Sequence, residues 1–213
     1  MLSYFSFIYL IRSNHPNFKI VIKFIFKIFK KIIFPFFSIF LSYSSVEILI
    51  SLDSSAPADL SNIESFTVAF LFTLYVTGFF AFIGFAYPTS KIAPNNYYKI
   101  YNPKALAIVS NILGIKHFQV LLLITFWGSK KNRKKYFNGT KKGLQNFIFQ
   151  TKQSEFGHLG GFIVISISSI FLLLNHYFLL VSIITLINIF GNFYPILLQR
   201  THRIRIEKIT KKI

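Results

Sequence analysis

A run of 23 residues without a charged side chain, from Ser65 to Tyr87, limits the folds open to this chain more than any other feature. At about 1.5 Å per residue, a helix of this length crosses the ~30 Å hydrocarbon core of a bilayer. The composition agrees, because 53% of the residues are hydrophobic and the mean hydropathy is +0.54. That hydrophobic share exceeds the roughly 45–50% of ordinary soluble domains. We therefore predict an all-α integral membrane protein.

Four apolar stretches have the length and composition of membrane spans. The stretch at 32–52 is the weakest of them, because it contains Pro35 and Glu47. We place Glu47 near the outer interface of the membrane, since a charge within the hydrocarbon is costly. The chain then divides into an N-terminal interfacial segment, 1–31, and a single membrane domain, 32–213. The parts of that domain are spans at about 32–52, 65–87, 156–174 and 177–198, a cytoplasmic loop at 88–155 and a basic cytoplasmic tail at 199–213.

The uneven distribution of charge predicts how the protein is oriented in the membrane. The chain has 24 Lys and Arg against 6 Asp and Glu, for a formal net charge of +18. The segment 53–64 holds three acids and no base, whereas seven of the thirteen residues 130–142 are basic. Basic loops stay on the cytoplasmic side. We predict a cytoplasmic-membrane protein with both termini inside, and anionic lipid head groups rather than nucleic acid as the partners of the excess charge.

Two segments are expected at the membrane surface. The apolar run 118–127 has ten residues, too few to cross a bilayer. We predict a short re-entrant or interfacial helix there, with Trp127 at the level of the head groups. In the N-terminal segment, the lysines fall on one helical face, which is typical of a basic amphipathic helix on an anionic membrane; the alternative is simply the cytoplasmic end of the first span. These lysines are Lys19, Lys23, Lys27, Lys30 and Lys31.

The last two predicted spans are separated only by Asn175 and His176, so we expect them to form an antiparallel hairpin. Topology alone then brings the start of the third span next to the end of the fourth. This convergence predicts a site at the cytoplasmic surface of the membrane. The polar residues that should meet there are Glu155, His158, Asn192, Gln199, Arg200 and Arg203.

Glu155 and His158 are the pair in this group best suited to catalysis. Three positions apart on a helix, they share a face, and a carboxylate beside an imidazole can orient it as a general base for a hydroxyl group. The structural alternative is that Glu155 caps the helix N-terminus while His158 bonds to a neighbour. Gly157, Gly160 and Gly161 surround the histidine and favour either close helix packing or the approach of an anion to free amides.

The remaining polar residues predict contacts with a substrate or with other helices. Asn188 and Asn192 lie four apart in the fourth span, where amides bond to other helices or to a ligand, and Pro195 should kink the helix near them. Arg200 and Arg203 share a helix face, and their guanidinium groups suit a phosphate or a carboxylate. Alternatively, the arginines anchor the helix to anionic lipid.

The sequence gives no support for a metal or a bound cofactor. It contains no cysteine, which excludes zinc–thiolate sites and thiol nucleophiles. Glu155 and His158 would supply only two metal ligands, and the spacing to His202 fits no metal-binding motif. We therefore predict no metal site and no bound cofactor.

Two segments of the C-terminal half, Gln153–His158 and Asn192–Arg205, resemble the glycosyl-4,4'-diaponeurosporenoate acyltransferase family. The similarity begins at Trp127 and rests on Glu-x-x-His before the hairpin and on Asn-x-x-Pro followed by Gln-Arg-x-x-Arg after it. The resemblance implies a multi-pass membrane enzyme that transfers a fatty acyl group to a sugar hydroxyl of a carotenoid glycoside. The positions that it marks are Glu155, His158, Asn192, Gln199, Arg200 and Arg203.

Residue chemistry and resemblance leave two classes of function open. As an enzyme, the chain would move an acyl group from acyl-CoA or a similar thioester to a glycolipid hydroxyl, with His158 as the base and Glu155 as its partner. Asn192 or Gln199 would stabilise the oxyanion, and the two arginines would hold the phosphates of the donor. As a non-catalytic scaffold or accessory protein, the chain would use its basic groups to bind anionic lipid. No protein partner follows from the sequence.

Overall fold

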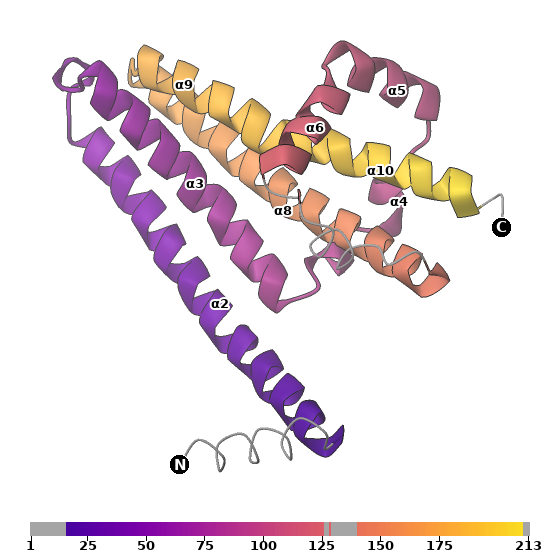
Figure 1. The fold of residues 1–213 in the computed structure, drawn as a ribbon. Helices are drawn as coiled ribbons and strands as arrows, with labels where there is room; N and C mark the ends of the chain where they lie inside the picture. The colour runs from indigo at the N-terminus through magenta and orange to yellow at the C-terminus, as the bar shows by residue number, and fades with distance from the viewer. Residues whose placement is uncertain (1–15, 126–127, 129–139, 211–213) are drawn as a thin grey trace.

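The structure is helical, which confirms the predicted all-α fold. The computed structural model describes residues 16–125, 128 and 140–210, and no strand occurs among them. A π-helical segment, Ile189–Phe193, joins the last two helices, and short 3-10 turns occur at Pro57–Asp59 and Thr89–Lys91. The α-helices (Figure 1) are α2 (Pro16–Asp53), α3 (Asn62–Ala86), α4 (Asn95–Tyr98), α5 (Pro103–Ile112), α6 (Ile115–Thr125), α8 (Lys141–Leu174), α9 (Phe178–Asn188) and α10 (Tyr194–Thr210).

Three helices of the described chain are long and apolar enough to cross a membrane, namely Asn62–Ala86, Gly143–Leu174 and Phe178–Thr210. The last of these runs through α9, the π-helical segment and α10. A fourth candidate is the pair α5–α6, whose two helices are bent by 68°. The fold therefore contains three to four candidate spans. The helix α2, which contains the predicted span 32–52, is not among these candidates.

α2 is one continuous helix of 38 residues that joins the predicted interfacial segment to the predicted first span. Its C-terminal half packs along α3, and its N-terminal half extends beyond the bundle (Figure 1). Apolar side chains such as Phe36 and Phe40 are exposed on its surface. Lys19, Lys23 and Lys27, which carry much of the predicted basic face, have side chains outside the described part of the structure.

α3 lies between α2 and the hairpin of α8 and α9. It begins at a capping box, in which the Ser61 hydroxyl accepts the Glu64 N–H at 3.3 Å and the Glu64 carboxylate accepts the Ser61 N–H at 2.9 Å. A Cβ atom at Gly78 would come within 2.8 Å of Leu41. The missing side chain at Gly78 therefore lets α2 and α3 pack closely.

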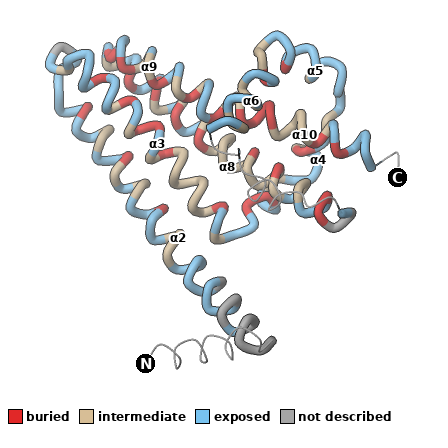
Figure 2. Tube along the Cα trace, viewed as in Figure 1, coloured by how far each residue is buried: buried red, intermediate tan, exposed pale blue. Residues whose placement is uncertain are grey.

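α8 and α9 form the antiparallel hairpin that their short connection predicts. His176 lies in the turn and has a φ of 64°. Tyr177 fastens the turn to the end of α2, because its hydroxyl lies 2.6 Å from the carbonyl oxygen of Leu52 and 2.7 Å from that of Ser55. The buried core lies between α3, α8 and α9 (Figure 2), so this closed end of the hairpin is firmly packed.

α8 begins earlier than the third predicted span. The Thr140 hydroxyl caps it by accepting the Gly143 N–H at 3.0 Å, and the helix runs unbroken to Leu174 because no proline interrupts it. Glu155 therefore lies in the middle of a helix, and the alternative that it caps a helix N-terminus is wrong. At 1.5 Å per residue, Glu155 lies roughly 28 Å from the closed end, close to the far side of a ~30 Å hydrocarbon layer.

The predicted loop 88–155 contains α4, α5, α6 and the first part of α8. The predicted short helix at 118–127 corresponds to α6; Trp127 and most of the basic cluster at 130–142 lie outside the described residues. α5 and α6 meet at Gly114, whose φ of 64° is left-handed and favours glycine. Both helices pack on α10, so this region folds back against the open end of the hairpin.

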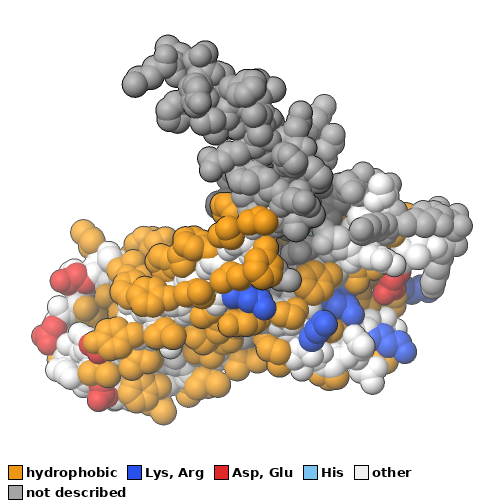
Figure 3. Space-filling model, turned by 90° about the horizontal axis from the view of Figure 1, so that it is seen from below, with side chains coloured by type: hydrophobic (Ala, Val, Ile, Leu, Met, Phe, Trp, Pro, Cys, Tyr) orange, Lys and Arg blue, Asp and Glu red, His pale blue; other side chains and the backbone are white. Residues whose placement is uncertain are grey.

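Charge is segregated along the molecule. In Figure 3, acidic side chains gather at the end that holds the connection between α2 and α3, which is also the closed end of the hairpin. The described Lys and Arg side chains lie toward the other end, and apolar side chains cover much of the surface between. The molecule therefore has one acidic end and one basic end, separated by an apolar surface.

Candidate functional site

A cavity of about 560 Å³ lies among α3, α6, α8 and α10, near the open end of the hairpin. Its wall is mostly apolar and includes Phe80, Leu122 and Leu198. His158 and Gln199 are among the few polar groups that interrupt this wall. A cavity of this size and lining is typical of a site for one ligand that has a large apolar part.

His158 lines the cavity and is held by a buried amide. Its Nδ1 atom lies 3.1 Å from Oδ1 of Asn192. The Asn192 amide nitrogen donates to Asn188 Oδ1 at 2.9 Å and to Thr77 Oγ1 at 3.0 Å, and this fixes Oδ1 as the atom that faces the histidine. Because Oδ1 can only accept, Nδ1 of the neutral ring carries the proton and Nε2 keeps its lone pair. This is the tautomer that a general base requires at Nε2.

Asn192 is fully buried and forms the centre of a polar network between helices. Asn188 extends the network to α8 by donating to the Phe162 carbonyl at 3.2 Å and to Ser166 Oγ at 3.3 Å. The prediction that these amides bond to other helices is therefore confirmed. Asn192 lies in the π-helical segment, just before Pro195, which has no N–H to bond back to the preceding turn. The disturbance expected from Pro195 thus takes the form of a π-helical turn.

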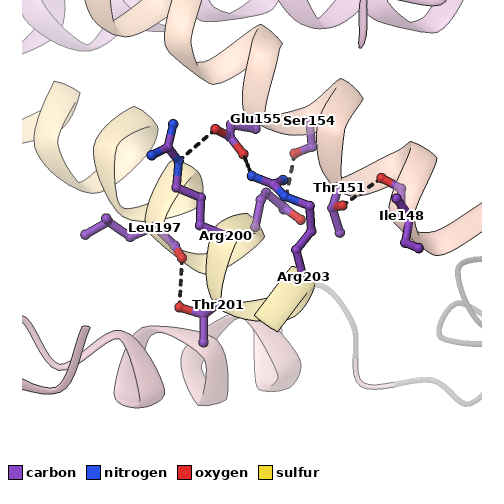
Figure 4. Close-up of polar contacts among 9 residues, drawn as sticks. Ile148, Thr151, Ser154, Glu155, Leu197, Arg200, Thr201 and Arg203 are labelled. Atoms are coloured by element: carbon purple, nitrogen blue, oxygen red, sulfur yellow. Dashed lines mark hydrogen bonds and ion pairs between the residues drawn. The ribbon is translucent and has the colours of Figure 1, made fainter. Parts of the chain in front are cut away.

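Glu155 is completely buried and bonds to two arginines of α10 (Figure 4). One carboxylate oxygen accepts Nε of Arg200 at 2.8 Å, and the other accepts Nη2 of Arg203. Arg203 is also buried, whereas 32% of the Arg200 side chain is exposed. One carboxylate between two guanidinium groups leaves one net positive charge. The predicted pairing of Glu155 with His158 is therefore wrong, and Asn192 is the residue that orients the imidazole.

The hairpin brings the six predicted residues to one end of the bundle but separates them into two groups. Successive residues of a helix point about 100° apart, so neighbours such as Gln199 and Arg200 face different surroundings. Gln199 faces the cavity and donates to Ser154 Oγ at 3.2 Å. The cavity group is His158, Gln199 and, behind the histidine, Asn192. The ion-pair group is Glu155, Arg200 and Arg203, none of which lines this cavity.

Two tyrosines that sequence reasoning missed belong to the ion-pair group. The ring centroid of Tyr97 lies 5.2 Å from the guanidinium carbon of Arg200, and that of Tyr98 lies 5.6 Å from the guanidinium carbon of Arg203. Burial, followed by the negative charge of Glu155, raises the pKa of both hydroxyls, that of Tyr98 to about 12. Both hydroxyls therefore remain proton donors at neutral pH. α4 has only four residues, so no periodic pattern could mark these tyrosines.

Gly160 and Gly161 serve helix packing beside the cavity. A Cβ atom at Gly160 would come within 2.4 Å of the Phe80 ring, and one at Gly161 within 3.0 Å of Asn192 Oδ1 and 3.4 Å of Thr77 Oγ1. Both glycines lie in the middle of α8, where the backbone amides are bonded within the helix. The alternative of an anion at free amides is therefore wrong, and the packing alternative is confirmed.

We expect Gly161→Ala to disturb the orientation of His158, because the added methyl group must displace the Asn192 side chain. Overpacking of this kind costs about 1–3 kcal/mol of stability. The matched control is Gly191→Ala, since a Cβ atom there would meet nothing within 4 Å. Nitrogen NMR of the labelled imidazole would report the tautomer. An unchanged His158 spectrum in Gly161→Ala would show that the contact with Asn192 does not set the tautomer.

These features describe an all-helical protein with candidate membrane spans and an internal cavity that holds an oriented histidine. Among the described residues, no three His, Asp or Glu side chains are grouped to hold a metal ion. The family model for glycosyl-4,4'-diaponeurosporenoate acyltransferase matches residues 94–212, more than half of the chain. The chain therefore belongs to this acyltransferase family. Comparisons with curated proteins and with solved structures gave no match.

Proposed function

We propose that the chain is a multi-pass membrane acyltransferase that moves a fatty acyl group from a thioester to a hydroxyl group of a glycolipid or carotenoid glycoside. The observation that carries this proposal is His158, which lines a mostly apolar cavity and is held with Nδ1 against a buried amide. The apolar wall suits a hydrocarbon chain, and membership of the acyltransferase family supports the class of reaction.

In the proposed reaction, Nε2 of His158 takes the proton of the acceptor hydroxyl as its oxygen attacks the thioester carbonyl. A new C–O bond forms, and the carbonyl oxygen becomes an oxyanion. Collapse of this intermediate breaks the C–S bond, and the imidazolium returns its proton to the departing thiolate. The products are an ester and a free thiol, so the steps need neither a metal nor a bound cofactor.

Gln199 is better suited than Asn192 to stabilise the oxyanion. Asn192 already donates its amide hydrogens to Asn188 and Thr77. The amide nitrogen of Gln199 has one printed bond, to Ser154, which leaves a second hydrogen for a ligand in the cavity. A donor of this kind typically contributes a factor of about 10²–10³ to the rate.

We infer that the cavity opens toward the cytoplasmic surface of the cell membrane. α2, α3, α8 and the α9–α10 span all run between the acidic end and the basic end of the molecule (Figure 1). If α2 crosses the bilayer beside α3, the four helices place both chain termini at the basic end, which the positive-inside rule assigns to the cytoplasm. The bent pair α5–α6 would then be re-entrant, and the basic surface would contact anionic lipid.

The proposal is tested by acyl transfer in membranes that contain the protein. Membranes with and without the chain are incubated with labelled acyl-CoA and a glycolipid, and the lipids are separated by chromatography. A labelled product that requires the protein supports the enzyme. If neither acyl-CoA nor other acyl thioesters give such a product, the alternative of a non-catalytic scaffold that binds anionic lipid is favoured.

A further inference from the structure

The ion-pair group at Glu155 differs from the cavity in having positive charge and many hydrogen-bond donors. We propose that Arg200 forms a phosphate-binding site at the membrane surface, with Glu155, Arg203 and Tyr97 as the residues that position it and maintain its charge. This site is separate from the cavity, and the inference does not depend on the proposed acyl transfer. The ligand would be a phosphate group with at least two accessible oxygen atoms.

Arg200 is already held in a conformation suited to binding. Its Nε donates to Glu155 at 2.8 Å, and its guanidinium carbon lies 5.2 Å from the ring centroid of Tyr97. Figure 4 shows the two terminal nitrogens of Arg200 turned away from Glu155, and they make no hydrogen bond with the described residues. The side chain is 32% exposed. Two adjacent N–H groups in a fixed plane match two oxygens of a phosphate.

The charge of Arg200 is not cancelled by its contact with Glu155. Arg203 bonds to the other oxygen of the same carboxylate and is buried, so it neutralises Glu155 from the inside. Arg203 also keeps Nε and Nη1 without a partner among the described residues, as do the hydroxyls of Tyr97 and Tyr98. Buried donors are usually satisfied. A cluster with spare donors, no spare carboxylate oxygen and one positive charge favours an anion.

The position of the cluster suits a phosphate at the interface of a membrane. Glu155 lies roughly 28 Å from the closed end of the hairpin, where the hydrocarbon layer of ~30 Å gives way to head groups. A phosphate there can belong to an anionic phospholipid or to a soluble phosphate compound such as coenzyme A. The chemistry of recognition is the same in both cases, so experiment must distinguish the two sources.

The test uses full-length protein in neutral detergent and measures affinity for two probes, coenzyme A in solution and short-chain phosphatidylglycerol in mixed micelles. We expect Arg200→Ala to weaken binding of at least one probe by about 10- to 100-fold, because a charged bidentate contact is lost. Arg205→Ala is the matched control: it removes the same charge from the same helix, at an exposed residue that bonds to Gln119. That control should change affinity by less than about threefold, as expected for a screened surface charge.

Further variants separate the geometry of the site from its charge and from folding. Arg200→Lys keeps the charge but not the fork and should bind weakly. Tyr97→Phe should bind like wild type, whereas Tyr97→Leu, which removes the aromatic face under Arg200, should weaken binding several-fold. Loss with coenzyme A alone identifies a soluble ligand, and loss with the phospholipid alone identifies a lipid. Equal effects of Arg200→Ala and Arg205→Ala, or no binding of either probe to wild type, would overturn the proposal.

Discussion

Replacing His158 with alanine should lower acyl transfer by about 10²–10⁴-fold, the usual contribution of a general base. The physical reason is that His158 is the cavity side chain whose tautomer is fixed by a buried acceptor, Oδ1 of Asn192. The measurement is the rate of labelled ester formation per folded molecule in purified membranes. His117→Ala is the matched control, because His117 is an exposed histidine of α6 and does not line this cavity.

Asn192→Ala gives an intermediate test of the same arrangement. It leaves the imidazole in place but removes its acceptor, so the rate should fall less than in His158→Ala. Wild-type activity in His158→Ala would place the chemistry on another group. Equal loss in His158→Ala and His117→Ala would show that the effect comes from general damage to the protein.

Glu155→Gln should lower the free energy of unfolding by about 3–5 kcal/mol, because it leaves the buried guanidinium of Arg203 without its counter-charge. Unfolding in detergent by heat or denaturant measures this effect. Glu207→Gln is the matched control, since Glu207 is an exposed glutamate of the same region and should change stability by less than about 0.5 kcal/mol.

A double variant identifies the cause of that loss. Glu155→Gln combined with Arg203→Met removes both buried charges and should recover much of the stability, because a buried ion pair is often replaced by apolar groups at little cost. Glu155→Gln molecules that do fold should keep most of their acyl transfer per molecule. Full stability together with lost activity would instead restore the sequence-based idea that Glu155 acts directly on His158.

The sequence was sufficient to predict which residues meet, because the two-residue connection at Asn175 and His176 leaves no arrangement other than a hairpin. It was insufficient to predict how they pair. Glu155 and His158 are three apart and do share a broad face of α8, but that face contacts two different neighbours. Long arginine side chains reach the carboxylate from the last helix, and a short amide reaches the imidazole from deeper in the bundle.

Other members of the site had no signal in the sequence. Thr77 is one hydroxyl within an uncharged span, and only the packing of α3 against the hairpin makes it a partner of Asn192. Tyr97 and Tyr98 lie in a four-residue helix between prolines and polar residues, and the fold-back of that region brings them to the arginines. Such contacts join segments that are distant in sequence, and no local period encodes them.

The π-helical segment Ile189–Phe193 makes the last span sensitive to its exact residue count. A π-helical turn contains one residue more than an α-helical turn, and each residue of an α-helix advances the direction of its side chain by about 100°. Loss of one residue here would shorten the span by only ~1.5 Å, yet it would rotate everything that follows. Arg200 and Arg203 would then turn away from Glu155, and Gln199 away from the cavity. In this stretch, a change in length acts on the site as a change in angle.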